Sequence, residues 1–194
     1  MNIPDFVAFP KMARYARSVI VTEKIDGTNA QIYINDDGEI LAGSRTRWIV
    51  PGDDNFGFAA WVKAHEDELR GLGPGHHFGE WWGSGIQRRY GLAERRFSLF
   101  NAIRWTATAP PACCNIVPIL AQGTLGSFTL EPIIEQLRQV GSIAAPGFMR
   151  PEGVVVFHTA ANVGFKLTLE NDDVPKAGLR LRDCQATADQ GVTR

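Results

Sequence analysis

Lys24 is the first residue whose type and setting could do chemistry. It ends a run rich in β-forming residues and is followed by Asp26 and Gly27. A neutral lysine amine is a nucleophile that can attack phosphorus, although an unperturbed lysine, with a pKa of about 10.4, is almost entirely protonated at pH 7. Gly27 would let the backbone turn tightly and approach a ligand. The string therefore suits covalent catalysis, while a solvated lysine at a strand end is the simpler explanation of the string taken alone.

Five further short segments continue the pattern that begins at 24–27 (KIDG). In chain order they are 44–46 (SRT), 78–81 (FGEW), 97–101 (FSLFN), 152–156 (EGVVV) and 165–167 (FKL). Together they resemble, in order, the motifs of the covalent nucleotidyltransferase superfamily of ligases and capping enzymes, and 168–172 (TLEND) resembles the fifth motif of small RNA ligases. The resemblance runs from about residue 19 to about residue 176. Six motifs in order are far more specific than any one of them, so the chain resembles a minimal ATP-dependent RNA ligase.

The resemblance implies an activity and a set of residues. Lys24 is expected to attack the α-phosphorus of ATP and form lysyl-AMP, after which the AMP passes to a 5′-phosphate of RNA and a 3′-hydroxyl seals the strand. The implied catalytic residues are Lys24, Arg45, Glu152 and Lys166. The implied nucleotide-binding residues are Glu23, Lys24, Asn29, Arg45, Glu80, Phe100, Glu152 and Lys166. The predicted activity is the repair of RNA at nicked or broken ends.

Charge in the predicted site serves both the nucleophile and the triphosphate. Arg45, Lys166 and a divalent cation would favour the neutral amine, because nearby positive charge disfavours an ammonium ion. Hard cations such as Mg²⁺ or Mn²⁺ prefer oxygen ligands and often retain waters. Glu80 and Glu152, joined by Asp26, are therefore predicted to hold the metal, directly or through its water shell.

Two positions depart from the family pattern. The fifth motif often carries two lysines one residue apart, whereas Gly164 and Thr168 flank Lys166 here. The motif that stacks on adenine often has an acid where Asn101 stands. Lys166 is therefore predicted as a phosphate-binding lysine, with Lys176 as a candidate for the second.

Strands and helices must position these residues. Alternation over 18–34, a turn at 36–38 and a second run at 39–42 predict a β-hairpin with Lys24 near its start. Helical spacing of apolar residues predicts amphipathic helices over 58–69 and 131–140. Further strands are predicted at 77–82, 97–100, 115–120, 153–157 and 163–169. The fold class is α+β, and the resemblance implies two packed antiparallel β-sheets with flanking helices and the nucleotide in the groove between them.

Composition bounds the class of protein. The chain has 194 residues, 44% of them hydrophobic, so one domain over residues 1–194 is expected, with a tail that frays after about residue 180. The net charge of -1 gives no global attraction to nucleic acid, so a polyanion site must be a local patch. The tract 87–90 (QRRY) is a candidate patch, and scattered solvated charge is the alternative.

Three cysteines form no disulfide framework, and no stretch approaches the roughly 20 apolar residues of a membrane helix. A cytoplasmic monomer with no membrane partner is therefore expected.

Two other kinds of enzyme and one non-catalytic kind of protein are alternatives that fit these motifs. An ATP-dependent DNA ligase and a capping guanylyltransferase use the same lysine chemistry, but they usually append an oligonucleotide-binding domain, and only 28 residues (194 minus 166) follow Lys166. NAD-dependent ligases need an extra N-terminal domain, so ATP is the predicted cofactor. A non-catalytic protein that binds nucleic-acid ends also fits. The missing domain leaves room for a repair partner protein that delivers RNA with 5′-phosphate and 3′-hydroxyl ends.

Overall fold

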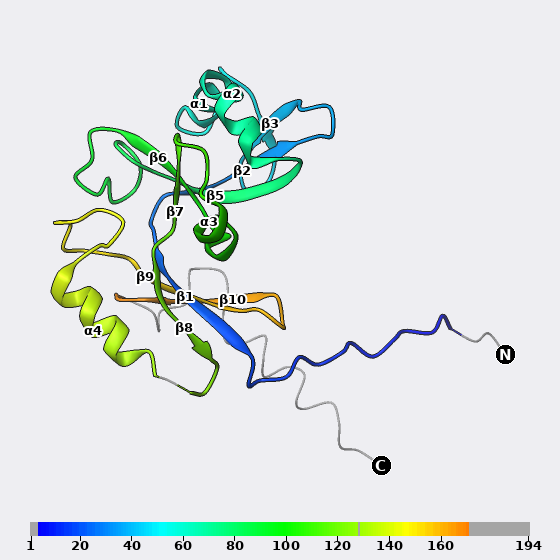
Figure 1. The fold of residues 1–194 in the computed structure, drawn as a ribbon, viewed down its shortest axis with the longest axis vertical. Coiled ribbons are helices and arrows are strands. Elements are labelled where there is room, and N and C mark those ends of the chain that lie inside the picture. Colours follow the sequence, from blue (N-terminus) through cyan, green and yellow to red (C-terminus); the bar gives the residue numbers. More distant parts are fainter. Residues whose placement is uncertain (1–3, 128, 171–194) are drawn as a thin grey trace, which may run out of the picture.

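Two β-sheets and four α-helices make up the part of the chain that the structure, a computed structural model, describes, residues 4–127 and 129–170 (Figure 1). The four-stranded sheet consists, in spatial order, of β10 (Val163–Thr168), β9 (Gly153–His158), β1 (Ser18–Lys24) and β8 (Ile119–Thr124), all antiparallel. The six-stranded sheet consists of β4 (Trp48–Ile49), β3 (Ile40–Gly43), β2 (Thr28–Ile34), β5 (Gly75–Gly83), β6 (Arg95–Leu99) and β7 (Cys114–Ile116). Its last pair, β6 with β7, is parallel. The predicted α+β class with two sheets and flanking helices is confirmed, and one of the sheets is mixed.

The chain crosses from one sheet to the other directly after Lys24. β1 lies in the four-stranded sheet and β2 in the six-stranded sheet, so the single run predicted over 18–34 is wrong, and residues 25–27 separate two strands. The alternation continued through the break because Ile25 is also buried, in the core between the sheets. The turn at 36–38 does join two antiparallel strands, β2 and β3, as predicted.

A second crossing lies beside the first. The run predicted over 115–120 is divided between β7 and β8, with Val117 and Pro118 leading the chain from one sheet to the other. The Pro118 carbonyl accepts a hydrogen bond of 2.9 Å from the Glu23 N–H, and the Val117 N–H donates one of 3.1 Å to the Leu99 carbonyl. The junction of the two sheets is therefore fastened next to the end of β1.

Three clusters of buried side chains hold these elements together. One lies between the six-stranded sheet and the helices α1 (Phe58–Ala64) and α2 (Glu66–Leu69), and its largest members include Phe58, Trp81, Phe97 and Leu69. A second lies between the four-stranded sheet and α4 (Glu131–Val140), and includes Val19, Val21, Leu137 and Val154. The third fills the junction with Ile25, Trp82, Tyr90, Ala102, Val117 and Ala145. Burial of each large apolar side chain contributes about 1.5–3 kcal/mol, so the junction is a packed core in its own right.

The helices differ from prediction at two places. The helix predicted over 58–69 breaks at His65 (φ -118°) into α1, α2 and a 3₁₀ turn at Arg70–Leu72. A helix that was not predicted, α3 (Ala102–Thr108), begins after Asn101, whose side chain accepts a hydrogen bond from the Arg104 N–H. The helix predicted over 131–140 is confirmed as α4. No helix in the described ranges is both long and apolar enough to cross a membrane.

The crossing after β1 predicts a strong intolerance at Gly27. A Cβ atom there would lie 2.4 Å from the Trp81 carbonyl oxygen and 2.7 Å from the Trp82 Cβ. The loop 25–27 or the backbone of β5 would therefore have to move. Gly27→Ala is expected to lower the free energy of unfolding by about 1–3 kcal/mol, measured by urea denaturation. Gly164→Ala is the matched control, because its Cβ would meet Val155 at an ordinary 3.6 Å. Equal stability of the two variants would contradict the close approach.

Candidate active site

Lys24 is held by a carboxylate at the point where β1 ends. Its Nζ lies 2.5 Å from Oε2 of Glu152, and the two side chains are 22% and 13% exposed. The pair is close because Lys24 is the register partner of Gly153, the first residue of β9. A lysine that is partly exposed and fixed by one carboxylate can be approached by a ligand from its open side.

Glu80 holds the loop that follows Lys24. It lies opposite Asn29 in the pairing of β5 with β2, and its Oε1 accepts a hydrogen bond of 3.0 Å from the Gly27 N–H. Its Oε2 accepts one of 3.4 Å from the Asn29 amide. Burial raises the pKa of Glu80 from 4.5 to about 7, against the lowering effect of the Gly27 hydrogen bond and of the Lys24 charge. Glu80 is therefore a buried acid that titrates near neutral pH.

Three predicted nucleotide-binding residues line one cavity of about 150 Å³. Asn29, Arg45 and Phe100 share it with Ala30, Gln31, Ser44 and Phe78. Phe100 is 43% exposed and Arg45 is also exposed, so an aromatic face and a cation are both open to a ligand. Since Asn29 contacts Glu80, this cavity adjoins the loop after Lys24. The arrangement offers a flat apolar surface beside donors, which suits a purine ring and its ribose.

Lys166 lies on the same face of the four-stranded sheet as Lys24. In β10 it pairs with Val155, while Thr168 pairs with Gly153, the residue that also pairs with Lys24. Because side chains alternate along a strand, Lys166 and Lys24 point to one side. Lys166 is exposed and two strands away from Lys24. The second candidate lysine, 176, and the predicted frayed tail lie outside the described residues.

The Glu23 side chain, predicted as nucleotide-binding, lies on the opposite face of β1 from that of Lys24. Its carboxylate accepts hydrogen bonds of 2.6 Å from the Ser142 hydroxyl, 2.8 Å from the Ile143 N–H and 2.9 Å from the Ala144 N–H. Burial raises the pKa of Glu23, and these three hydrogen bonds partly offset that effect. Consecutive residues of a strand point to opposite faces, which is why Glu23 reaches residues 142–144 while Lys24 reaches Glu152.

The predicted metal ligands are near one another but do not converge. Asp26 pairs with Arg88, its Oδ2 lying 3.1 Å from the Arg88 Nε. Glu80 binds Gly27, and Glu152 binds Lys24. In residues 4–127 and 129–170 no group of three His, Cys, Asp or Glu side chains is arranged as a metal ligand set. The donors fit a cation held by one or two carboxylates with water and phosphate oxygens, as Mg²⁺ usually is.

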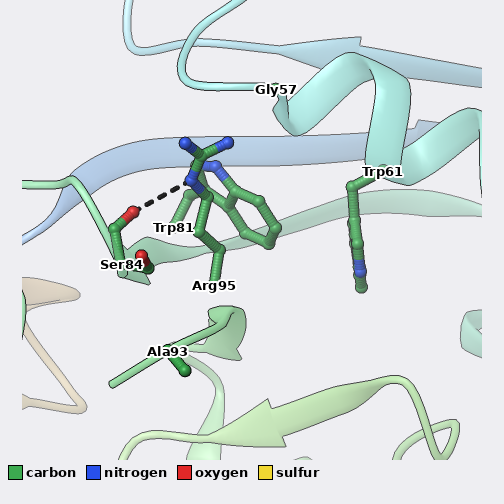
Figure 2. A pocket seen from close by; sticks show the side chains of 6 residues that line it. All are labelled: Gly57, Trp61, Trp81, Ser84, Ala93 and Arg95. Carbon is green, nitrogen blue, oxygen red and sulfur yellow. Dashed lines mark hydrogen bonds between the residues drawn. The ribbon is translucent and has the colours of Figure 1, made fainter. Parts of the chain in front are cut away.

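A larger hollow, of about 390 Å³, lies on the opposite face of the six-stranded sheet (Figure 2). Its lining residues are Gly57, Trp61, Trp81, Ser84, Ala93 and Arg95. Trp81 follows Glu80 in β5 and so points away from the Lys24 side. The Arg95 guanidinium donates to the carbonyls of Ser84 (3.0 Å) and Phe56 (2.8 Å). None of the predicted site residues lines this hollow, so size does not mark the site here.

Two residues near the site were missed from sequence. The Tyr90 hydroxyl accepts a hydrogen bond of 2.7 Å from the Asp26 N–H, and Arg88 pairs with the Asp26 carboxylate. Both belong to the tract 87–90, for which the sequence leaves a phosphate patch and scattered solvated charge as alternatives. The only sequence signal for their structural role is the presence of an aromatic residue and an arginine near a turn.

The buried carboxyl of Glu80 predicts a pH dependence of stability. The Glu80 carboxyl binds its proton more tightly in the folded protein than in the unfolded chain. Its contribution to the free energy of unfolding is therefore fully present below about pH 4.5 and is lost as pH rises towards about 7. The free energy of unfolding of the wild type should therefore fall across this window relative to Glu80→Gln, by up to roughly 3 kcal/mol. Urea denaturation of both proteins at a series of pH values measures the difference. Parallel pH curves would show that Glu80 titrates normally.

Solved structures of an RNA ligase share this fold. Three structures of the Naegleria gruberi RNA ligase match the chain, each 20% identical in sequence. A ligand-free lysine-to-alanine mutant matches with a TM-score of 0.58, covering 86% of this chain and 57% of that one. A lysine-to-alanine mutant with ATP and Mn matches at 0.57 (82% and 52%), and a glutamate-to-alanine mutant with AMP and Mn at 0.59 (86% and 57%). The chain thus spans little more than half the length of the Naegleria enzyme.

Sequence comparison gives the family directly. No protein of curated function matches the chain. The sequence model of the RNA ligase family matches residues 17–168, which contain Lys24, the cavity around Phe100 and Lys166. Most of the chain is covered by that match, and the chain belongs to the RNA ligase family.

Proposed function

We propose that the chain is the nucleotidyltransferase domain of an ATP-dependent RNA ligase, with Lys24 as the residue that becomes attached to AMP. The observation that carries the proposal is the placement of Lys24. It ends β1 with its Nζ 2.5 Å from Glu152, and the cavity of Asn29, Arg45 and Phe100 adjoins the following loop. Membership of the RNA ligase family supports the same assignment.

The first chemical step follows from this placement. The Lys24 amine attacks the α-phosphorus of ATP, an N–P bond forms, and the bond from that phosphorus to the bridging oxygen of pyrophosphate breaks. Glu152 is in position to accept the proton that leaves Nζ. Arg45 and Lys166, both exposed cations, would neutralise charge on the phosphate oxygens.

A divalent cation would assist this step. Two of the Naegleria ligase structures contain ATP or AMP with Mn. In this chain Glu80 and Glu152 lie beside Lys24, with Asp26 close to them, and these acids are proposed to hold the cation directly or through its waters. When bound, Mg²⁺ or Mn²⁺ would supply Lewis-acid stabilisation of the transferring phosphoryl group.

The later steps concern RNA. The AMP is transferred from Lys24 to a 5′-phosphate of RNA, and a 3′-hydroxyl then attacks the activated end and releases AMP. Because the chain spans little more than half of the Naegleria enzyme, the RNA ends are proposed to be held partly by another domain or a repair partner protein. Residues 1–194 are proposed to form one domain that contains all the groups for lysine adenylylation.

The nucleophile is tested by labelling. Incubation with α-labelled ATP and Mg²⁺ or Mn²⁺, followed by denaturing electrophoresis, is expected to label the wild type and not Lys24→Ala. Lys63→Ala is the matched control, because Lys63 is an exposed lysine of α1 paired with Glu66, and it should label fully. Thermal unfolding of Lys24→Ala should remain one cooperative transition, at a lower temperature than in the wild type because Glu152 loses its partner. Label on Lys24→Ala would identify a different nucleophile.

The substrate is tested by a chase of the labelled protein. Sealing of nicked RNA in preference to nicked DNA supports the RNA ligase, and the reverse preference supports a DNA ligase. Labelling by GTP in place of ATP supports a guanylyltransferase. A wild-type protein that takes no label supports a non-catalytic protein that binds nucleic-acid ends.

A further inference from the structure

The segment 84–92, in the connection from β5 to β6, has at three positions a backbone conformation that residues other than glycine rarely adopt. Gln87, Arg89 and Tyr90 have φ values of 42°, 59° and 51°. Each such residue costs on the order of 1–3 kcal/mol and persists only where surrounding contacts determine the conformation. The contacts of this segment must therefore outweigh the summed conformational cost of these three residues.

Tyr90 makes the first set of contacts. It is 2% exposed, and its ring centroid lies 4.9 Å from that of Trp82 and 4.7 Å from that of Phe148. Its hydroxyl oxygen accepts the hydrogen bond of 2.7 Å from the Asp26 N–H. Burial raises the pKa of Tyr90, so the hydroxyl stays neutral throughout the neutral pH range. The backbone two residues after Lys24 is therefore fastened to the junction core.

Arg88 makes the second set of contacts. Its Nε donates to Oδ2 of Asp26 at 3.1 Å, and its Nη1 donates to the Arg150 carbonyl at 3.1 Å. Its Nη2 lies 3.7 Å from the Glu170 carboxylate. One guanidinium thus contacts the residue two positions after Lys24 and the residue two positions before Glu152. The two segments that carry the Lys24–Glu152 pair are tied together by this side chain.

We propose that segment 84–92 is a brace that positions Lys24 for adenylyl transfer, with Tyr90 and Arg88 as its positioning residues; the proposal rests on the proposed function. Lys24 is the last residue of β1, so on its C-terminal side only the loop 25–27 fixes its backbone. The brace holds both the N–H and the carboxylate of Asp26 in that loop. In-line attack on phosphorus requires the nucleophile within a fraction of an ångström of its position, and a misplacement of about 1 Å can cost about 100-fold in rate.

Conservative variants separate positioning from folding. Tyr90→Phe removes only the hydroxyl and keeps the ring between Trp82 and Phe148, and Arg88→Met keeps the apolar stem without the guanidinium. At saturating ATP, both are expected to slow single-turnover formation of lysyl-AMP by about 10- to 100-fold. The ATP concentration at half-maximal rate should not change. Arg88→Lys should recover part of the rate, because it restores the charge opposite Asp26.

Two matched variants control for the substitutions themselves. Tyr33→Phe removes a tyrosine hydroxyl of β2, and Arg138→Met removes an arginine exposed on α4. Both should form lysyl-AMP at the wild-type rate. Because the Tyr90 hydroxyl is neutral across the assay pH range, the rate of lysyl-AMP formation in Tyr90→Phe should be lower than in the wild type by the same factor at every pH. Wild-type rates in both brace variants, or a loss expressed only as weaker ATP binding, would overturn the brace.

Hydrogen exchange tests the brace independently of enzymatic activity. The Asp26 amide is expected to exchange faster in Tyr90→Phe than in the wild type, and at the wild-type rate in Tyr33→Phe. An unchanged Asp26 amide in Tyr90→Phe overturns the brace even if the enzyme is active. A wild type that takes no label on Lys24 overturns the ligase proposal instead, so the two failures give different results.

Discussion

The hydrogen bond from the Gly27 N–H to Glu80 is the constraint on which the site depends. The chain leaves the four-stranded sheet at Lys24 and enters the six-stranded sheet at Thr28, with three residues between. So short a connection leaves the Gly27 N–H without a strand partner, and a buried N–H without an acceptor is costly. Glu80 supplies the acceptor, and the missing Cβ of Gly27 allows β5 to lie this close. The position of Lys24, the proposed nucleophile, follows from how the two sheets are joined.

Buried carboxylates lie on both sides of that junction. Glu23 is 1% exposed and Glu80 is 9% exposed, and burial raises the pKa of each. Desolvation of a carboxylate is unfavourable unless donors replace water. Backbone N–H groups of Ile143, Ala144 and Gly27 provide such donors. In the described residues every buried side-chain nitrogen or oxygen has a hydrogen-bond partner. Glu23 thus ties residues 142–144 to the end of β1, and Glu80 ties the loop 25–27 to β5.

Elements that local sequence determines match their predictions. Glu152 directly precedes the predicted strand at 153, Lys166 lies within a predicted strand, and α4 has its predicted bounds. Prediction from sequence failed where the outcome is set by tertiary pairing. The run 18–34 is rich in β-forming residues on both sides of residues 25–27, and only the pairing partners reveal that two strands are present. Glu23 adjoins Lys24 in sequence, yet alternation turns it to the opposite face.

Arg88 shows that sequence alone also cannot tell what a charged side chain contacts. A basic tract beside a glycine-rich turn is typical of phosphate contacts, and composition cannot distinguish an arginine that meets RNA from one that meets Asp26. The structure uses this cation internally. With a net charge of -1 over the chain, attraction to a polyanion cannot be general. Arg45, in the loop between β3 and β4, and Lys166, in β10, are both exposed. Under the proposed function these two cations come from different sheets, so the phosphates of one nucleotide would be neutralised by residues on both sides of the junction.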